Sequence, residues 1–100
     1  MRAEGMEELP DALKSKIRVM GADMAEQSQV SAVEKFAELW QMPSPSEKKL
    51  AAALKLHLEQ GGQQRWNVVV GSSFGAEVSH ASGGYLFFYY EEMAVMLWRQ

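Results

Sequence analysis

The sequence predicts an α+β fold in which two helices pack on an antiparallel β-sheet, and three observations support this prediction. Two segments, within residues 23–42 and 44–60, carry apolar residues at helical spacing. Four short apolar and aromatic runs then follow within residues 66–99, separated by Gly, Ser or paired acidic residues. Helices followed by closely spaced strands are the order expected of an α+β domain.

The totals of the chain limit what it can be. One hundred residues are enough for one domain. The formal charge of −3 argues against nucleic acid as a partner, because nucleic-acid binding needs a basic surface. The absence of cysteine excludes disulfides and thiolate metal sites. No apolar run approaches the ~20 residues of a membrane span, so we expect a soluble cytoplasmic domain without a membrane partner.

The N-terminal part divides into two segments. Residues 1–15 mix acidic residues with Gly5 and Pro10, and we expect a mobile extension with a short helical turn around residues 9–13. The domain itself is expected over residues 16–100. It begins with a partly alternating run, Lys16–Met20, whose charged residues suit the edge of a sheet.

The first long helix has a start signal in Asp23, a good N-cap, followed three residues later by Glu26 as the partner in a capping box. It should end before Pro43. The residues of its expected apolar stripe are Val30, Val33, Phe36, Ala37 and Trp40.

The second helix should start at once after Pro43. Ser44 is the expected N-cap, Pro45 the first helical residue, and Glu47 the partner in a second capping box. Gly61 and Gly62 should end it. The residues of its expected apolar face are Leu50, Ala53, Leu54 and Leu58.

The strands of the expected sheet are joined by tight turns. Residues 71–73 and 82–84 supply Gly and Ser, whereas Glu91-Glu92 offers no glycine, so a positive φ there costs roughly 1 kcal/mol. In the run Tyr85–Tyr90, odd positions share one face and even positions the other, and both faces are apolar. Two helices cover only one face, so we expect a second subunit to cover the other.

No residues form a credible catalytic or metal site. His57 and His80 lack the clustered further ligands that a metal needs. Glu77, Ser79 and His80 are near neighbours in one strand, whose side chains alternate between faces, so they cannot converge as a hydrolytic triad. The glycines of residues 71–75 precede no helix, which argues against a phosphate loop. We expect no enzyme, no cofactor and no bound metal.

From about Ile17 to Arg99 the chain resembles the eight-kilodalton dynein light chain family. The resemblance rests on motifs in a specific order: Ala22-Asp23-Met24, Trp66, Val69-Val70-Gly71, Phe74-Gly75, Val78-Ser79-His80, Phe87-Phe88-Tyr89 and Ala94-Val95-Met96-Leu97-Trp98. It implies a dimer in which residues 74–80 form a strand swapped into the partner's sheet. Such dimers carry two parallel grooves that bind extended segments of larger proteins, often around a Thr-Gln-Thr anchor, by adding them as a strand.

The resemblance also implies site residues. The peptide-binding groove would contain Glu47, Lys48, Phe74, Gly75, Ala76, Glu77, Val78, Ser79, His80, Tyr85, Phe87, Tyr89 and Met96. The dimer interface would contain Trp66, Asn67, Val69, Phe74, Glu77, Val78, Ser79 and Phe88. Exposed amide donors at the start of the second helix suit the carbonyl of the anchor glutamine.

Several residues differ from the usual family pattern: Asn67 replaces an interface histidine, Glu77 a groove tyrosine, and Glu91-Glu92 the usual glycine turn. Glu77, Trp98 and the N-terminal extension resemble the axonemal outer-arm branch. The resemblance therefore implies a non-enzymatic light chain of a cilium or flagellum that pairs dynein intermediate-chain segments, as a homodimer or with a related light chain. The alternative is a general cytoplasmic hub that dimerises many short linear motifs.

Overall fold

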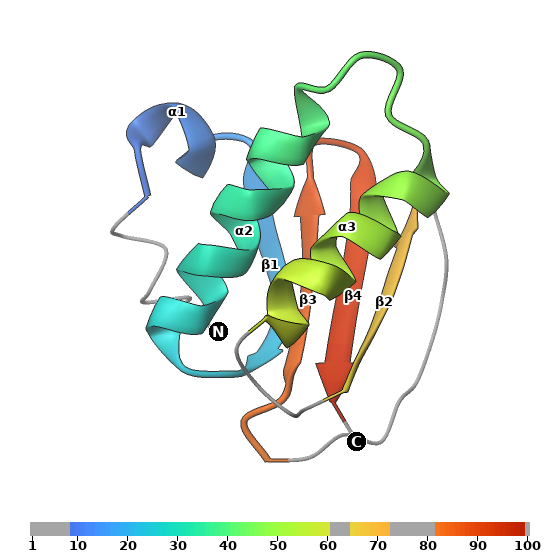
Figure 1. Cartoon of the computed structure of the whole chain (residues 1–100). Helices are drawn as coiled ribbons and strands as arrows, with labels where there is room; N and C mark the ends of the chain where they lie inside the picture. The colour runs from blue at the N-terminus through green and yellow to red at the C-terminus, as the bar shows by residue number, and fades with distance from the viewer. Residues whose placement is uncertain (1–8, 61–64, 73–81, 100) are drawn as a thin grey trace.

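The computed structural model describes residues 9–60, 65–72 and 82–99 and arranges them in two layers (Figure 1). One layer is an antiparallel sheet with the strand order β1-β3-β4-β2. Its strands are β1 (Ile17–Asp23), β2 (Trp66–Gly71), β3 (Tyr85–Tyr90) and β4 (Met93–Arg99). The other layer consists of helices α2 (Glu26–Trp40) and α3 (Glu47–Glu59), which cover one face of the sheet. The predicted α+β class, and the edge position of the first strand, are confirmed.

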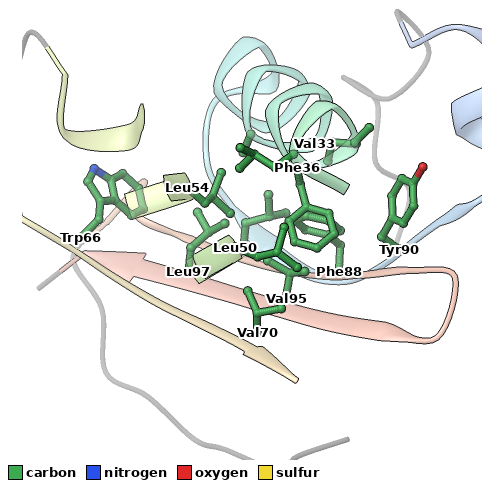
Figure 2. Packing of buried hydrophobic residues seen from close by; sticks show 14 of the residues in the cluster. Val33, Phe36, Leu50, Leu54, Trp66, Val70, Phe88, Tyr90, Val95 and Leu97 are labelled. Atoms are coloured by element: carbon green, nitrogen blue, oxygen red, sulfur yellow. The ribbon is translucent and has the colours of Figure 1, made fainter. Parts of the chain in front are cut away.

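The core lies between the helices and the sheet (Figure 2). α2 contributes Phe36, which is fully buried. Its ring packs edge-on against the ring of Phe88 in β3, with the two ring centroids 5.9 Å apart. α3 contributes Leu50 and Leu54, which are also fully enclosed. Burial of such side chains is the main stabilising term of a small domain. The predicted apolar faces of both helices are therefore confirmed.

Segment 9–15 is packed on the domain rather than extended from it. Leu9 is 3% exposed and belongs to the core cluster, and Leu13 packs against that cluster. Between them begins a single helical turn, α1 (Asp11–Lys14). The expected mobile extension therefore needs correction for these residues, while residues 1–8 lie outside the described part of the chain.

Both predicted helix caps are wrong. Asp23 ends β1 and accepts a hydrogen bond from the Gly83 backbone N–H at 3.2 Å, whereas the N-cap of α2 is Ala25, which has no side-chain cap hydrogen bond. In the second helix Ser46, not Ser44, is the N-cap: its hydroxyl accepts from the Lys49 N–H at 3.1 Å. The capping-box spacing favoured Ser44, because Glu47 lies three residues after it and Lys49 three residues after Ser46, but the structure uses Ser46.

Two turns lie at the ends of β3, where the sequence suggests them. Gly83 adopts φ 76°, which glycine tolerates without strain. Glu91 adopts φ 54° between β3 and β4, so this turn carries the expected cost of a left-handed non-glycine residue. Its N–H donates to the Lys16 carbonyl at 2.8 Å, which ties the turn to the start of β1.

Candidate functional site

The strand register defines a second face of the sheet, turned away from α2 and α3, which we name the distal face. Its residues form three rows across β1, β3, β4 and β2. The rows are Arg18–Tyr89–Ala94–Gly71, then Gly21–Phe87–Met96–Val69, then Asp23–Tyr85–Trp98–Asn67. The alternate residues of β3, Leu86, Phe88 and Tyr90, are buried against the helices.

The distal face is mainly apolar although none of the described helices covers it. Met96 is 1% exposed but does not belong to the helix-side core cluster, which agrees with its place opposite Phe87 and Val69. Tyr85, Phe87 and Tyr89 are half-buried, and Val69 is 39% exposed. An apolar sheet face of this kind, bordered by polar edge residues, is typical of an interaction surface.

One end of the β1 edge of the distal face carries a positive charge. The Arg18 guanidinium lies over the Tyr89 ring, 4.9 Å from its centroid, and the Tyr89 and Phe87 rings are 5.8 Å apart. Such a cation–π contact is worth about 0.5–1 kcal/mol at an exposed site. Arg18 therefore packs on Tyr89, at one end of the row of aromatic side chains along β3, and not on Tyr85 at the other end.

The structure brings part of the predicted groove together. Tyr85, Phe87, Tyr89 and Met96 lie side by side on the distal face. Glu47 and Lys48, by contrast, are exposed in the first turn of α3, in the helix layer, so a single chain does not bring them to this face. The remaining predicted groove residues, Phe74, Gly75, Ala76, Glu77, Val78, Ser79 and His80, lie outside the described residues.

The predicted dimer interface needs a correction at two positions. Phe88 is fully buried and Trp66 is 7% exposed, and both belong to the core between the sheet and the helices (Figure 2). A residue already enclosed by its own chain has no surface to offer a partner, so we remove both from the interface. Asn67 and Val69 are exposed on the distal face, where a partner could reach them.

Sequence reasoning assigned six residues of the distal face to no site: Arg18, Gly21, Asp23, Gly71, Ala94 and Trp98. For Gly21 and Asp23 the reason is an irregularity in β1 between Val19 and Gly21, where the extra residue Met20 breaks the alternation. A glycine inside a strand pattern is a signal for such a bulge, so Gly21 could have indicated it.

The rest of the described surface shows no catalytic arrangement. Ser31 Oγ and His57 Nε2 are 3.0 Å apart, which links α2 to α3 by a hydrogen bond on the exposed side of the helices. Among the residues that the structure describes, no three metal-ligating side chains come together, and no helix is long and apolar enough to cross a membrane. His57 is thus best explained as a helix-linking residue.

A small polar cluster fixes the end of α3 to the start of β2. Lys55 Nζ donates to Glu59 Oε2 at 2.5 Å and to the Trp66 carbonyl at 2.6 Å, and the Trp66 N–H donates to the same Glu59 oxygen at 2.8 Å. These hydrogen bonds hold the pKa of Glu59 below its ordinary value, and the bond from Lys55 has a larger effect than the bond from Trp66.

This cluster makes the stability of the fold depend on pH. Because the pKa of Glu59 is lowered in the folded chain, its contribution is complete above the ordinary Glu pKa of about 4.3 and is lost as the pH falls through the lower folded-state pKa. We expect Glu59→Gln to weaken stability at neutral pH and to flatten this acid loss. Urea unfolding at neutral and acid pH measures both. Glu38→Gln, which removes only a surface pair with Lys35 within α2, is the control and should leave the acid loss intact.

Comparison with solved structures identifies the fold as that of dynein light chain-like domains. The dynein light chain-like domain of the Fasciola hepatica calcium binding protein FhCaBP2 superposes with a TM-score of 0.73 at 22% identity, over 86% of this chain and 93% of that one. The DLC-like domain of CsTAL3 superposes with a TM-score of 0.71 at 19% identity, over 92% of this chain and 96% of that one.

Sequence comparison then gives the family. The family described as Dynein light chain type 1 matches residues 16–100, and the chain belongs to it. "Dynein light chain 1, cytoplasmic" of Candida glabrata is 27% identical over 84 residues, covering 84% of this chain and 96% of the relative. The protein of the same name from Debaryomyces hansenii is 38% identical over 53 residues, covering 53% of this chain and 58% of the relative. This family is non-enzymatic, as the sequence led us to expect.

Proposed function

We propose that this chain is a dimeric light chain of a dynein complex that binds extended segments of intermediate chains and holds two of them side by side. The observation that carries the proposal is the apolar distal face, which includes the half-buried rings of Tyr85, Phe87 and Tyr89 and the exposed Val69. A second copy covering this face would bury it, as apolar strand surface requires.

Strand addition fits the edges of the described sheet. β1 and β2 lie at the two ends of the strand order, so each pairs with one neighbour among the described strands. Backbone groups on the other side of an edge strand are available to an added strand. The strand that we expect the partner to supply is residues 74–80, and the client segment would add next to it. Two grooves in one dimer would make binding bivalent and raise the effective concentration of the paired clients.

In such a dimer Glu47 and Lys48 would reach a groove across the subunit boundary. Their position at the N-terminus of α3, where backbone N–H groups lack helical partners, suits the carbonyl of an anchor glutamine. The proposal therefore assigns them to the groove of the assembled dimer rather than to that of a single chain.

Two kinds of dynein light chain are candidates for this peptide binding, an axonemal one and a cytoplasmic one. Glu77, Trp98 and the N-terminal segment favour an axonemal outer-arm light chain that serves dedicated intermediate chains. The names of the two relatives favour the second candidate, a cytoplasmic light chain that dimerises many short linear motifs.

Native mass spectrometry with two kinds of peptide tests the proposal. The full chain is mixed with a peptide containing Thr-Gln-Thr and, separately, with segments of axonemal intermediate chains. We expect a dimer that carries two peptides, and a preference for the axonemal segments supports the outer-arm setting. Equal binding of many Thr-Gln-Thr peptides supports the hub instead. A monomer that binds neither kind of peptide contradicts both.

A further inference from the structure

The β1 bulge decides which residues of this strand reach the distal face. Val19 pairs with Phe88 on the helix side, but the next pair is Gly21 with Phe87, because Met20 is an extra residue without a counterpart. In a regular strand Gly21, two residues after Val19, would share its helix-facing side. The inserted residue shifts the alternation by one, and Gly21 and Asp23 therefore turn to the distal face.

Gly21 leaves a space that Tyr85 occupies. A Cβ atom at position 21 would lie 3.2 Å from Cε2 and 3.5 Å from Oη of the Tyr85 ring. Tyr85 itself pairs with Asp23, so its ring leans over β1 toward the neighbouring row. The φ angle of Gly21 is not positive, and the backbone there accepts any residue. The glycine thus permits the close approach of the ring, which a Cβ atom would displace by a few tenths of an ångström, and it is not required for a turn.

Because Gly21 has no side chain, the central row of the distal face contains no polar side chain. Gly21, Phe87, Met96 and Val69 follow one another across the whole sheet. The rows on either side each have a charged residue at the β1 end, Arg18 in one and Asp23 in the other. Gly21 therefore keeps the central row apolar up to the edge of the sheet, where the Tyr85 ring forms a flat border.

We propose that Gly21 is a specificity-determining residue: by admitting the Tyr85 ring over β1, it selects client segments that place an apolar, flat side chain on this part of the distal face. This inference rests on the proposed function, because it needs a client segment in the groove. Stacking on an aromatic ring contributes about 0.5–1.5 kcal/mol beyond area burial. A client with Phe at this position should therefore bind about three- to tenfold more tightly than one with Leu, Ser or Asp.

A positional scan tests the proposal. Short synthetic peptides containing Thr-Gln-Thr carry Phe, Leu, Ser or Asp at one flanking position at a time, and their affinities for the full chain are measured by calorimetry. The wild-type chain should prefer Phe at one flanking position, and Leu serves as the apolar side chain that cannot stack. Tyr85→Leu removes the ring and should reduce that preference to less than about twofold, and Gly21→Ala, which displaces the ring, should reduce it by a smaller factor. Preferences at the other positions should stay unchanged.

The controls separate the possible failures. Leu56→Ala, an exposed position on α3 that is 64% accessible, should keep the wild-type preferences. The Hα protons of Gly21, followed by NMR, should show an upfield ring-current shift that Tyr85→Leu abolishes while the fold is kept. If both variants bind peptides with wild-type preferences, the inference is overturned and the proposed function stands. A wild-type chain that binds none of these peptides overturns both.

Discussion

Phe88→Ala is expected to lower the free energy of unfolding by about 3–5 kcal/mol, the range for removing a large aromatic side chain from a core. Phe88 is fully buried, and its ring meets that of Phe36 at 5.9 Å. Phe36 in turn contacts the Tyr90 ring at 5.6 Å and the Trp40 ring at 6.0 Å, so the cavity would open in the centre of an aromatic cluster. Such a loss is a large part of the stability of a domain of this size. Urea unfolding followed by tryptophan fluorescence measures it.

The neighbouring residue provides a matched control. Phe87 has the same side chain on the same strand but lies on the distal face and is half-buried. Phe87→Ala should leave the secondary structure in place and should weaken the proposed dimer, which is measured at a concentration where that dimer would be populated in the wild-type chain. If Phe87→Ala unfolds the chain as much as Phe88→Ala does, the assignment of the two faces is wrong.

Much of the fold could be predicted because the apolar spacing of the two helices and the alternation of β3 are strong local signals. Phe36, Leu50 and Leu54 are core residues for the same reason. The helix starts were predicted less well. The spacing predicted Asp23 as an N-cap, yet it is the last residue of β1 and the N-cap is Ala25. Asp23 also accepts a hydrogen bond from Gly83, which is distant in sequence, and only the three-dimensional structure brings these two residues together.

The candidate site was predicted in part, for a related reason. The alternation within Tyr85–Tyr90 placed Tyr85, Phe87 and Tyr89 on one face, and the register agrees. Phe88 was assigned to the interface through the family resemblance, although the same alternation puts it on the helix side. Gly21 was missed because one extra residue in β1 shifts every later side chain to the opposite face, and the sequence pattern does not show where the shift occurs.

The largest effect on assembly is expected from Val69→Asp. Val69 lies on β2 opposite Met96, on the distal face, and is 39% exposed in the single chain. In the proposed dimer this position would be enclosed by the second copy, and an unpaired charge enclosed in an apolar interface costs several kcal/mol. The dissociation constant of the dimer should therefore rise by more than about a hundredfold. Sedimentation equilibrium over a dilution series measures this change.

Leu56→Asp is the control for Val69→Asp. Leu56 is the more exposed of the two at 64%, but it lies on α3, in the layer on the other side of the sheet. A charged side chain at this position would be exposed to water and would not contact the partner, so dimerisation and peptide binding should be unchanged. Equal loss of the dimer in both variants would mean that a general increase in charge, and not the covering of the distal face, governs assembly. A dimer that survives Val69→Asp would place the subunit contact on another surface, and the groove proposed between the subunits would have to be abandoned with it.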